Sequence, residues 1–233
     1  MYVIDDKLNE TPNDAFMKYF AEINRIALSS GADLEGNLYY RSHRRMPDTA
    51  VVARNEITPD FRTKRYNLSM AVTGKKLLLE VGFNAGHSAL LALETNPSLT
   101  YIGVDIARHK YTRPCGDYLK SVYGDRFDVI YGSSLHVLPE FKKDSRANYV
   151  DLVHVDGGHG EQIASADLQN ILALPAGQGL VRHVVVDDAG AHIRRLLISL
   201  VNSRGMLSET YGGLWRGSAN MCFRLLTDKV EAE

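Results

Sequence analysis

Short apolar runs of strand length alternate along the chain with stretches that have the apolar spacing of helices. The runs lie at residues 76–81, 100–105, 126–131, 149–155, 179–186, 206–211 and 221–226. Helical spacing is found between them, at residues 88–93, 111–123, 162–174 and 192–203. Strands that alternate with helices are typical of a parallel sheet built from strand–helix–strand units. The pattern therefore predicts an α/β fold for residues 76–233.

The first 75 residues have a different pattern, which predicts two helices and a long polar segment. We expect the first helix to have Thr11 as its N-cap and to continue from Pro12 to about Ser29. Its apolar residues fall on one face, which suits either the core or a homodimer contact: Phe16, Phe20, Ile23 and Ala27. A second helix is predicted at residues 61–72, with a capping signal at Thr58.

Residues 32–54, between the two predicted helices, form a long loop with a cluster of basic side chains: Arg41, His43, Arg44 and Arg45. Long ordered loops in compact domains are often lids or binding segments, and a basic one could meet a phosphate, a carboxylate or a sugar acid. A solvated basic surface explains the same residues equally well. We treat residues 1–75 as an N-terminal helical and lid extension.

The first strand of the α/β region leads into a glycine turn and a helix. Gly82 and Gly86 let a ligand approach the backbone, and the helix that follows offers unpaired N–H groups at its N-terminus. A dinucleotide site favours glycine where this chain has Asn84. Glu80, at the strand end, would repel a pyrophosphate but suits the amino group of a methionine moiety. The turn therefore favours S-adenosylmethionine over NAD, and Asp105, at the end of the next strand, could hold the ribose hydroxyls.

This combination resembles the class I S-adenosylmethionine-dependent methyltransferases. The resemblance rests on the pattern E-x-G-x-x-x-G-x-S, from Glu80 to Ser88, followed by a strand that ends in Asp105. It implies a Rossmann-like, doubly wound, seven-stranded sheet in which a terminal hairpin adds an antiparallel strand. Relatives commonly have Gly-Asp-Ser at the turn near adenine. Here Ser133 stands in place of the acid and Ser134 in place of the serine.

Acidic residues also follow the fourth and fifth strands. Asp156 ends one strand, and Asp187 and Asp188 end the other. Ligands of doubly wound sheets bind beyond the carboxyl ends of the strands, so we expect these carboxylates to converge beside the cofactor. Hard oxygen ligands favour Mg²⁺, Mn²⁺ or Ca²⁺. The alternative is that the acids cap the helices that follow them.

The pattern D-G-x-H at Asp156, with D-D at Asp187, resembles the metal-dependent sugar O-methyltransferases of the macrocin and mycinamicin type, which are related to the catechol O-methyltransferase group. The resemblance implies that the three aspartates are metal ligands, with Asp156 also beside the cofactor, and that His159 is the general base. His192 is the second candidate for the base. Many relatives carry an acid where this chain has Gly158.

The sequence thus predicts a divalent-cation-dependent O-methyltransferase that acts on a sugar or a glycosylated natural product. Methylation of a catechol-type phenol is an alternative, because vicinal oxygens chelate a metal in both cases. A non-catalytic S-adenosylmethionine-binding module is a second alternative, although cofactor binding alone needs neither the acids nor His159. An NAD-dependent dehydrogenase is a third, and Asn84 argues against it.

The net charge and the apolar content of the chain indicate which kinds of molecule it binds. The 233 residues carry a net charge of -1, which encodes no general attraction to nucleic acid or to an acidic membrane. No apolar stretch approaches the length of a membrane span, so we expect a cytoplasmic protein with a small-molecule acceptor. The two cysteines, Cys115 and Cys222, are too few for a disulfide framework and are expected to be ordinary thiols.

Overall fold

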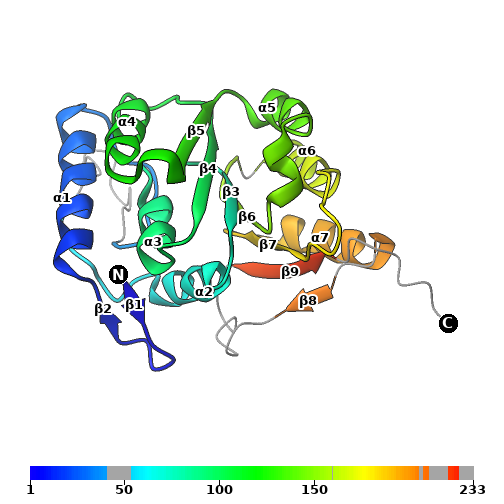
Figure 1. Ribbon diagram of the computed structural model, residues 1–233, viewed down its shortest axis with the longest axis horizontal. Coiled ribbons are helices and arrows are strands. Elements are labelled where there is room, and N and C mark those ends of the chain that lie inside the picture. The colour runs from blue at the N-terminus through cyan, green and yellow to red at the C-terminus, as the bar shows by residue number, and fades with distance from the viewer. Residues whose placement is uncertain (41–53, 159, 205–206, 210–219, 226–233) are drawn as a thin grey trace.

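The structure of the protein is a computed structural model that describes residues 1–40, 54–158, 160–204, 207–209 and 220–225 (Figure 1). A seven-stranded sheet has the strand order β5-β4-β3-β6-β7-β9-β8. Its strands are β3 (Leu77–Val81), β4 (Thr100–Asp105), β5 (Phe127–Tyr131), β6 (Leu152–Val155), β7 (Arg182–Val186), β8 (Leu207–Glu209) and β9 (Met221–Leu225). Strands β3 to β7 pair in parallel, whereas β9 pairs antiparallel with both β7 and β8. The predicted sheet and its antiparallel addition are confirmed.

Helices cover both faces of this sheet (Figure 1). One group consists of α1 (Asp14–Ser29), α2 (Arg62–Val72), α3 (His87–Thr95) and α4 (Thr112–Tyr123), and the other of α5 (Ser134–Phe141), α6 (Glu161–Leu172) and α7 (Ala191–Arg204). Two short 3-10 helices lie at Gly124–Arg126 and Ser145–Tyr149. Each face therefore has its own apolar core, and the central parallel strands β3 and β6 are buried on both sides.

The N-terminal segment shares the core of the first face. Phe16, Phe20 and Ile23 of α1 are fully buried in one cluster with residues of α3, α4 and the sheet. These side chains are used inside the chain itself, so this face of α1 is not available for a homodimer contact. The division into residues 1–75 and 76–233 stays a prediction.

The predicted start of the first helix is wrong by two residues. Asn13, not Thr11, is the N-cap of α1, and its side chain accepts a hydrogen bond from the N–H of Phe16. Thr11 instead belongs to a short hairpin that the sequence did not reveal, in which β1 (Val3–Ile4) pairs with β2 (Glu10–Thr11). Thr11, which local capping rules favour as the N-cap, is therefore part of β2 and lies outside the helix.

The predicted cap of α2 is also absent. Thr58 Oγ1 donates to the Tyr39 carbonyl oxygen, and Phe61 precedes the helix at φ 57° without a side-chain cap. The basic cluster from Arg41 to Arg45 lies outside the described residues. Helix α5 was not predicted, and the segment is helical from Ser134 to Phe141 with Pro139 inside the helix.

A buried ion pair between α2 and β2 links the N-terminal hairpin to the rest of the domain. Arg65 is fully buried, and its guanidinium donates to both carboxylate oxygens of Glu10, at 2.5 and 2.7 Å. It also donates to the carbonyl oxygens of Asp60, at 2.6 Å, and Thr58, at 2.8 Å. Planar, bidentate contacts of this kind need arginine and could not be formed by lysine.

His87, the first residue of α3, is a buried histidine in the contact between α1 and α3. Its ring lies 5.7 Å from that of Phe20, and Nε2 lies 3.0 Å from Asn24 Oδ1. Burial lowers the pKa of His87 from 6.5 to about 3. The imidazole is therefore neutral in the folded protein at every pH near 7.

We expect stability to fall as the pH falls from 6.5 toward 3. Because the folded pKa of His87 lies below the unfolded value, its contribution is fully present above pH 6.5 and is lost progressively below it. The loss should reach about 2 kcal/mol at pH 5. Urea unfolding of His87→Gln between pH 7 and pH 5 should show a weaker pH dependence than wild type. The exposed His136→Gln serves as the control, and equal slopes for all three proteins would contradict the assignment.

None of the helices in the described part of the chain has the length and apolar character needed to cross a membrane.

Candidate active site

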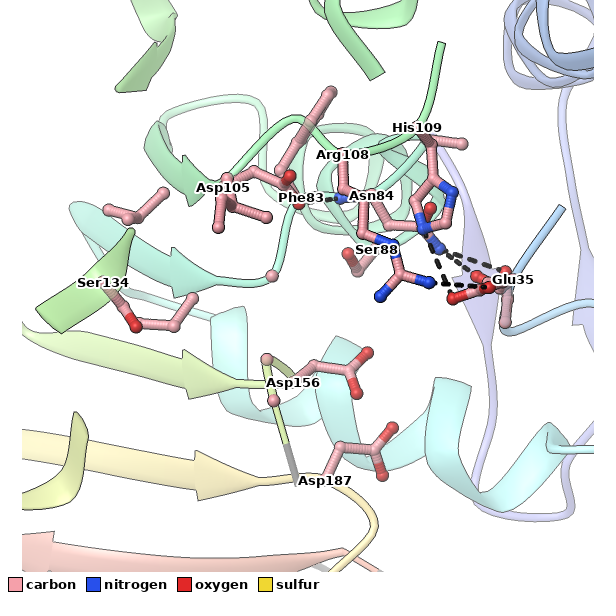
Figure 2. A pocket seen from close by; sticks show the side chains of 18 of the residues that line it. Glu35, Phe83, Asn84, Ser88, Asp105, Arg108, His109, Ser134, Asp156 and Asp187 are labelled. Carbon is pink, nitrogen blue, oxygen red and sulfur yellow. Dashed lines mark hydrogen bonds and ion pairs between the residues drawn. The ribbon is translucent and has the colours of Figure 1, made fainter. Parts of the chain in front are cut away.

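A cavity of about 680 Å³ opens where the parallel strands end (Figure 2). Its walls come from the segments that follow β3, β4, β5, β6 and β7, together with residues 35–38, Phe61 and Lys64. The carboxyl ends of the strands meet at this edge because the connections are parallel crossovers. The sequence placed its candidates at these ends, and the fold brings most of them to one cavity.

The glycine turn lines the cavity through Gly82 and the residues that follow it, whereas Gly86 is not among the lining residues. Gly82 has φ 101°, and a Cβ there would lie 2.2 Å from the carbonyl oxygen of Asp156. Gly86 has φ 85° and is the N-cap of α3, where a Cβ would meet Leu119 and Phe83. Both glycines are therefore required by the packing of the protein itself, in addition to any ligand. Ser88, in the first turn of α3, also lines the cavity.

Asp105 is held in one orientation at the end of β4. Its Oδ2 accepts from the N–H of Asn84 at 2.7 Å, and its Oδ1 accepts from the N–H of Ala107 at 2.6 Å. Each oxygen keeps a lone pair for a further donor. The carboxylate is thus fixed before any ligand arrives, as a ribose-binding acid requires.

Asn84 links the glycine turn to the N-terminal segment. It has φ 54°, a conformation that asparagine tolerates better than most residues. Its side chain donates to the carbonyl oxygens of Glu35 and Gly36 and accepts from the hydroxyl of Tyr111 at 2.7 Å. Sequence reasoning used Asn84 only to exclude a dinucleotide site and missed this contact.

Charged side chains from two segments of the chain also line the cavity. Glu35 lies 3.3 Å from His109 Nε2 and 3.9 Å from the Arg108 guanidinium, as the dashed lines in Figure 2 show. Asn37 lies deeper in the wall, where Oδ1 accepts from the N–H groups of Tyr39 and Tyr40. The buried Nδ2 of Asn37 has no hydrogen-bond partner among the described residues. Such a donor fits an oxygen of a bound ligand.

Ser133 and Ser134, the residues predicted near adenine, both line the cavity. The same wall contains Ile106, which is 66% exposed, and Leu135, which is 42% exposed. Large apolar side chains that remain exposed inside a cavity suit a flat aromatic ring. These two residues were not recognised in the sequence, since a single apolar residue after a strand carries no distinctive pattern.

Glu80 does not line the cavity. Its carboxylate is fully buried, accepts from the Tyr101 hydroxyl and lies 2.6 Å from Nδ1 of His154 on the neighbouring strand β6. Burial alone would lower the pKa of His154, but the hydrogen bond and charge of Glu80, with the charges of Asp156 and Asp187, raise it to about 9. In this position Glu80 contacts His154 inside the sheet. It does not face the cavity, where the expected contact with the amino group of a methionine moiety would be made.

Asp156 and Asp187 lie side by side at the ends of β6 and β7, with their carboxylates pointing the same way (Figure 2). With His154, each offers a potential ligand atom, and these atoms all lie within 4.8 Å of one another. Burial and the neighbouring Asp187 carboxylate raise the pKa of Asp156 well above its usual range. The predicted convergence of these two acids is present, and His154 is a donor that sequence reasoning missed.

Asp188 lies outside that group of three. Its side chain is 53% exposed, and its backbone has φ 46°. The predicted base His159 lies outside the described residues. The side chain of His192, the second candidate, does as well.

Lys64 of α2 contacts both acids that follow β7. Its ammonium lies 2.7 Å from a carboxylate oxygen of Asp187 and 2.7 Å from one of Asp188. Burial would lower the pKa of Lys64, but these two carboxylates raise it, so the side chain is a cation at neutral pH. The sequence gave no signal for this contact, because Lys64 lies far from both acids in the chain.

Comparison with known proteins agrees with this arrangement. Residues 79–189 match the family model Methyltransf_24, described as a methyltransferase domain. No curated protein sequence matches the chain. The family match runs from within β3 to just past β7 and so includes most of the segments that line the cavity.

Solved structures share the fold at low sequence identity. An O-methyltransferase from Bacillus cereus, in complex with SAH, has a TM-score of 0.57 and 15% identity, with 93% of this chain and 92% of that chain covered. TomG from Streptomyces achromogenes, an O-methyltransferase involved in tomaymycin synthesis, has a TM-score of 0.57 and 16% identity over the same shares.

MycE, a methyltransferase from the mycinamycin biosynthetic pathway in complex with Mg and SAH, has a TM-score of 0.51 and 16% identity, with 75% of this chain and 52% of that chain covered. These likenesses show the fold. Residues 79–189 are thus similar to a methyltransferase domain, within a chain that shares the fold of these O-methyltransferases.

Proposed function

We propose that this protein transfers the methyl group of S-adenosylmethionine to a hydroxyl of a small, hydroxyl-rich acceptor, with a divalent cation bound at the acidic cluster. One observation carries the proposal. The glycine turn with Asp105 and the pair of Asp156 with Asp187 line the same cavity. A cofactor held at the first group would therefore lie next to an acceptor held at the second.

The cofactor end of the cavity supplies groups for each part of S-adenosylmethionine. Asp105 suits the ribose hydroxyls, and Ser133 and Ser134, with the apolar wall beside them, suit the adenine. The N-terminus of α3, at Gly86 and Ser88, suits the methionine carboxylate, because its first N–H groups carry partial positive charge. With Glu80 buried, our candidate for the amino group is Asp156, which lines the cavity and whose backbone packs against Gly82.

The acidic end has a donor set that fits a divalent cation. Asp156 and Asp187 supply oxygen atoms, and Asp188 follows directly in the chain. His154, whose Nδ1 is already oriented by Glu80, would add an imidazole nitrogen on losing a proton as the metal binds. A carboxylate that fixes the ring of a ligating histidine is common at metal sites. The mixed donor set suits Mn²⁺ as well as Mg²⁺ or Ca²⁺.

The chain's own residues have two tasks in this reaction, which are alignment and proton removal. The sulfonium is already activated, so catalysis depends mainly on holding the acceptor oxygen in line with the methyl group. A cation bound at the acidic cluster would lower the pKa of the acceptor hydroxyl. We propose that His159 takes the proton, with His192 as the alternative.

An acceptor with adjacent oxygens is the class that this site fits best, because two neighbouring oxygens can bind one cation. A sugar or a glycosylated natural product is our first proposal, supported by the likeness to MycE. A catechol-type phenol is the alternative, since it offers the same pair of oxygens. Turnover of a panel of both acceptor types would separate them.

Calorimetric titration of S-adenosylmethionine and its demethylated product tests the cofactor site. We expect both to bind, with and without EDTA, because Asp156 is the one proposed cofactor group that also belongs to the metal cluster. Asp105→Ala should weaken binding about tenfold to a hundredfold, since hydrogen bonds to a charged group contribute about 1.5–3 kcal/mol. The exposed Asp125→Ala is the control. No binding to the wild type would overturn the proposed function.

A further inference from the structure

Lys64 holds a position at the acidic cluster that none of the roles above explains. It belongs to α2, in the N-terminal part of the chain, whereas the acids follow strands of the sheet. Its side chain is only 13% exposed, and its ammonium lies 2.7 Å from both Asp187 and Asp188. Asp187, a proposed metal ligand, is therefore already paired with a cation that belongs to the chain itself.

Two cations cannot share these carboxylate oxygens without repulsion. A divalent ion at Asp187 would lie within a few ångströms of the Lys64 ammonium, and like charges so close in a partly buried site repel strongly. Metal binding at Asp187 therefore favours movement of the ammonium away from this carboxylate. Before metal binding, however, the positive charge of Lys64 reduces the electrostatic repulsion between Asp187 and Asp156.

We propose that Lys64 is an internal competitor of the divalent cation, which keeps the acidic cluster assembled without metal and is displaced from Asp187 when the metal binds. The proposal rests on the proposed function, since it assumes that the cluster binds a cation. Its consequence is a lowered metal affinity. Displacement also removes the Lys64 contact from both Asp187 and Asp188, so that Asp188 can join the donors.

The ring of Phe61 offers an alternative partner for the displaced Lys64 ammonium. Lys64 Nζ lies 5.6 Å from the centre of the Phe61 ring, which also lines the cavity. An ammonium over an aromatic face is attracted by the ring at about this distance. Lys64 could therefore leave Asp187 without becoming an unpaired buried charge.

The test compares Mn²⁺ binding to wild type and Lys64→Met by calorimetry, with Lys64→Arg and the exposed Lys76→Met as matched variants. We expect Lys64→Met to bind Mn²⁺ about tenfold tighter or more, because each 1.4 kcal/mol of lost competition gives a factor of ten. Lys64→Arg keeps the charge and should not gain affinity, and Lys76→Met should behave as wild type.

Thermal unfolding supplies a second measurement. In EDTA, Lys64→Met should melt at a lower temperature than wild type, because its acids then have no cation from α2, and added Mn²⁺ should stabilise this variant more than it stabilises wild type. If Lys64→Met does not fold, Lys64→Gln removes the same charge and keeps a polar end. Equal Mn²⁺ affinity in wild type and the uncharged variants would overturn the role of Lys64 alone. No Mn²⁺ binding to any of the proteins would overturn the proposed cation site, and the competition with it.

Discussion

Replacing Asp187 with asparagine is expected to lower the rate of methyl transfer by about a hundredfold or more. A bound cation that polarises the acceptor supplies several kcal/mol, and each 1.36 kcal/mol is a factor of ten in rate. Asp187 is the best position to test, because it lies in the group of three potential ligands and is only 4% exposed. Asparagine keeps the size of the side chain and can still accept from Lys64, so the fold should survive.

The measurement is turnover at saturating S-adenosylmethionine, with Mn²⁺ or Mg²⁺ varied, alongside cofactor affinity by calorimetry. We expect the affinity for the cofactor to stay near the wild-type value, while the response to metal is lost. The exposed Asp125→Asn is the control. A variant that kept both the wild-type rate and the metal response would show that Asp187 holds no cation.

The same assay separates the metal ligands from the proposed base. His159→Ala should lose turnover while it still binds Mn²⁺, whereas Asp187→Asn should lose both. If His159→Ala kept full turnover, the role of base would pass to His192. Removal of metal by EDTA from the wild type should reproduce the effect of Asp187→Asn.

The second large effect concerns stability. Replacing Arg65 with methionine should lower the free energy of unfolding by about 3–5 kcal/mol, because it leaves the buried Glu10 carboxylate without its main partner. The side chain of Glu10 is only 8% exposed, so water cannot replace the guanidinium. The variant also loses the donors to the carbonyl oxygens of Thr58 and Asp60.

Thermal unfolding provides the measurement, with an expected decrease in Tm of roughly 6–20 °C for a chain of this size. Arg62→Met is the matched control, since Arg62 is 37% exposed and makes one contact to Glu10 at 3.3 Å. That control should lose no more than about 1 kcal/mol. Equal effects in the two variants would mean that burial does not decide the strength of this ion pair.

The sequence predicted the α/β sheet because its signals are local. Apolar runs such as residues 77–81 and 100–105 are long enough to define strands, and Gly82 and Gly86 mark the turn between strand and helix. Local capping was a weaker guide. Thr11 and Thr58 both have the residue type of an N-cap, yet pairing with β1 and contact with Tyr39 decided their positions.

The carboxyl ends of parallel strands meet at one edge, so the sequence by itself also determined that Asp105, Asp156 and Asp187 would share a site. Only the tertiary structure decided what surrounds these acids. The register of β3 against β6 places Glu80 beside His154, which buries one acid and adds a possible ligand. The packing of α2 brings Lys64 to Asp187. Contacts of this kind join residues far apart in the chain, and no local pattern encodes them, because their energy depends on packing and on burial from water.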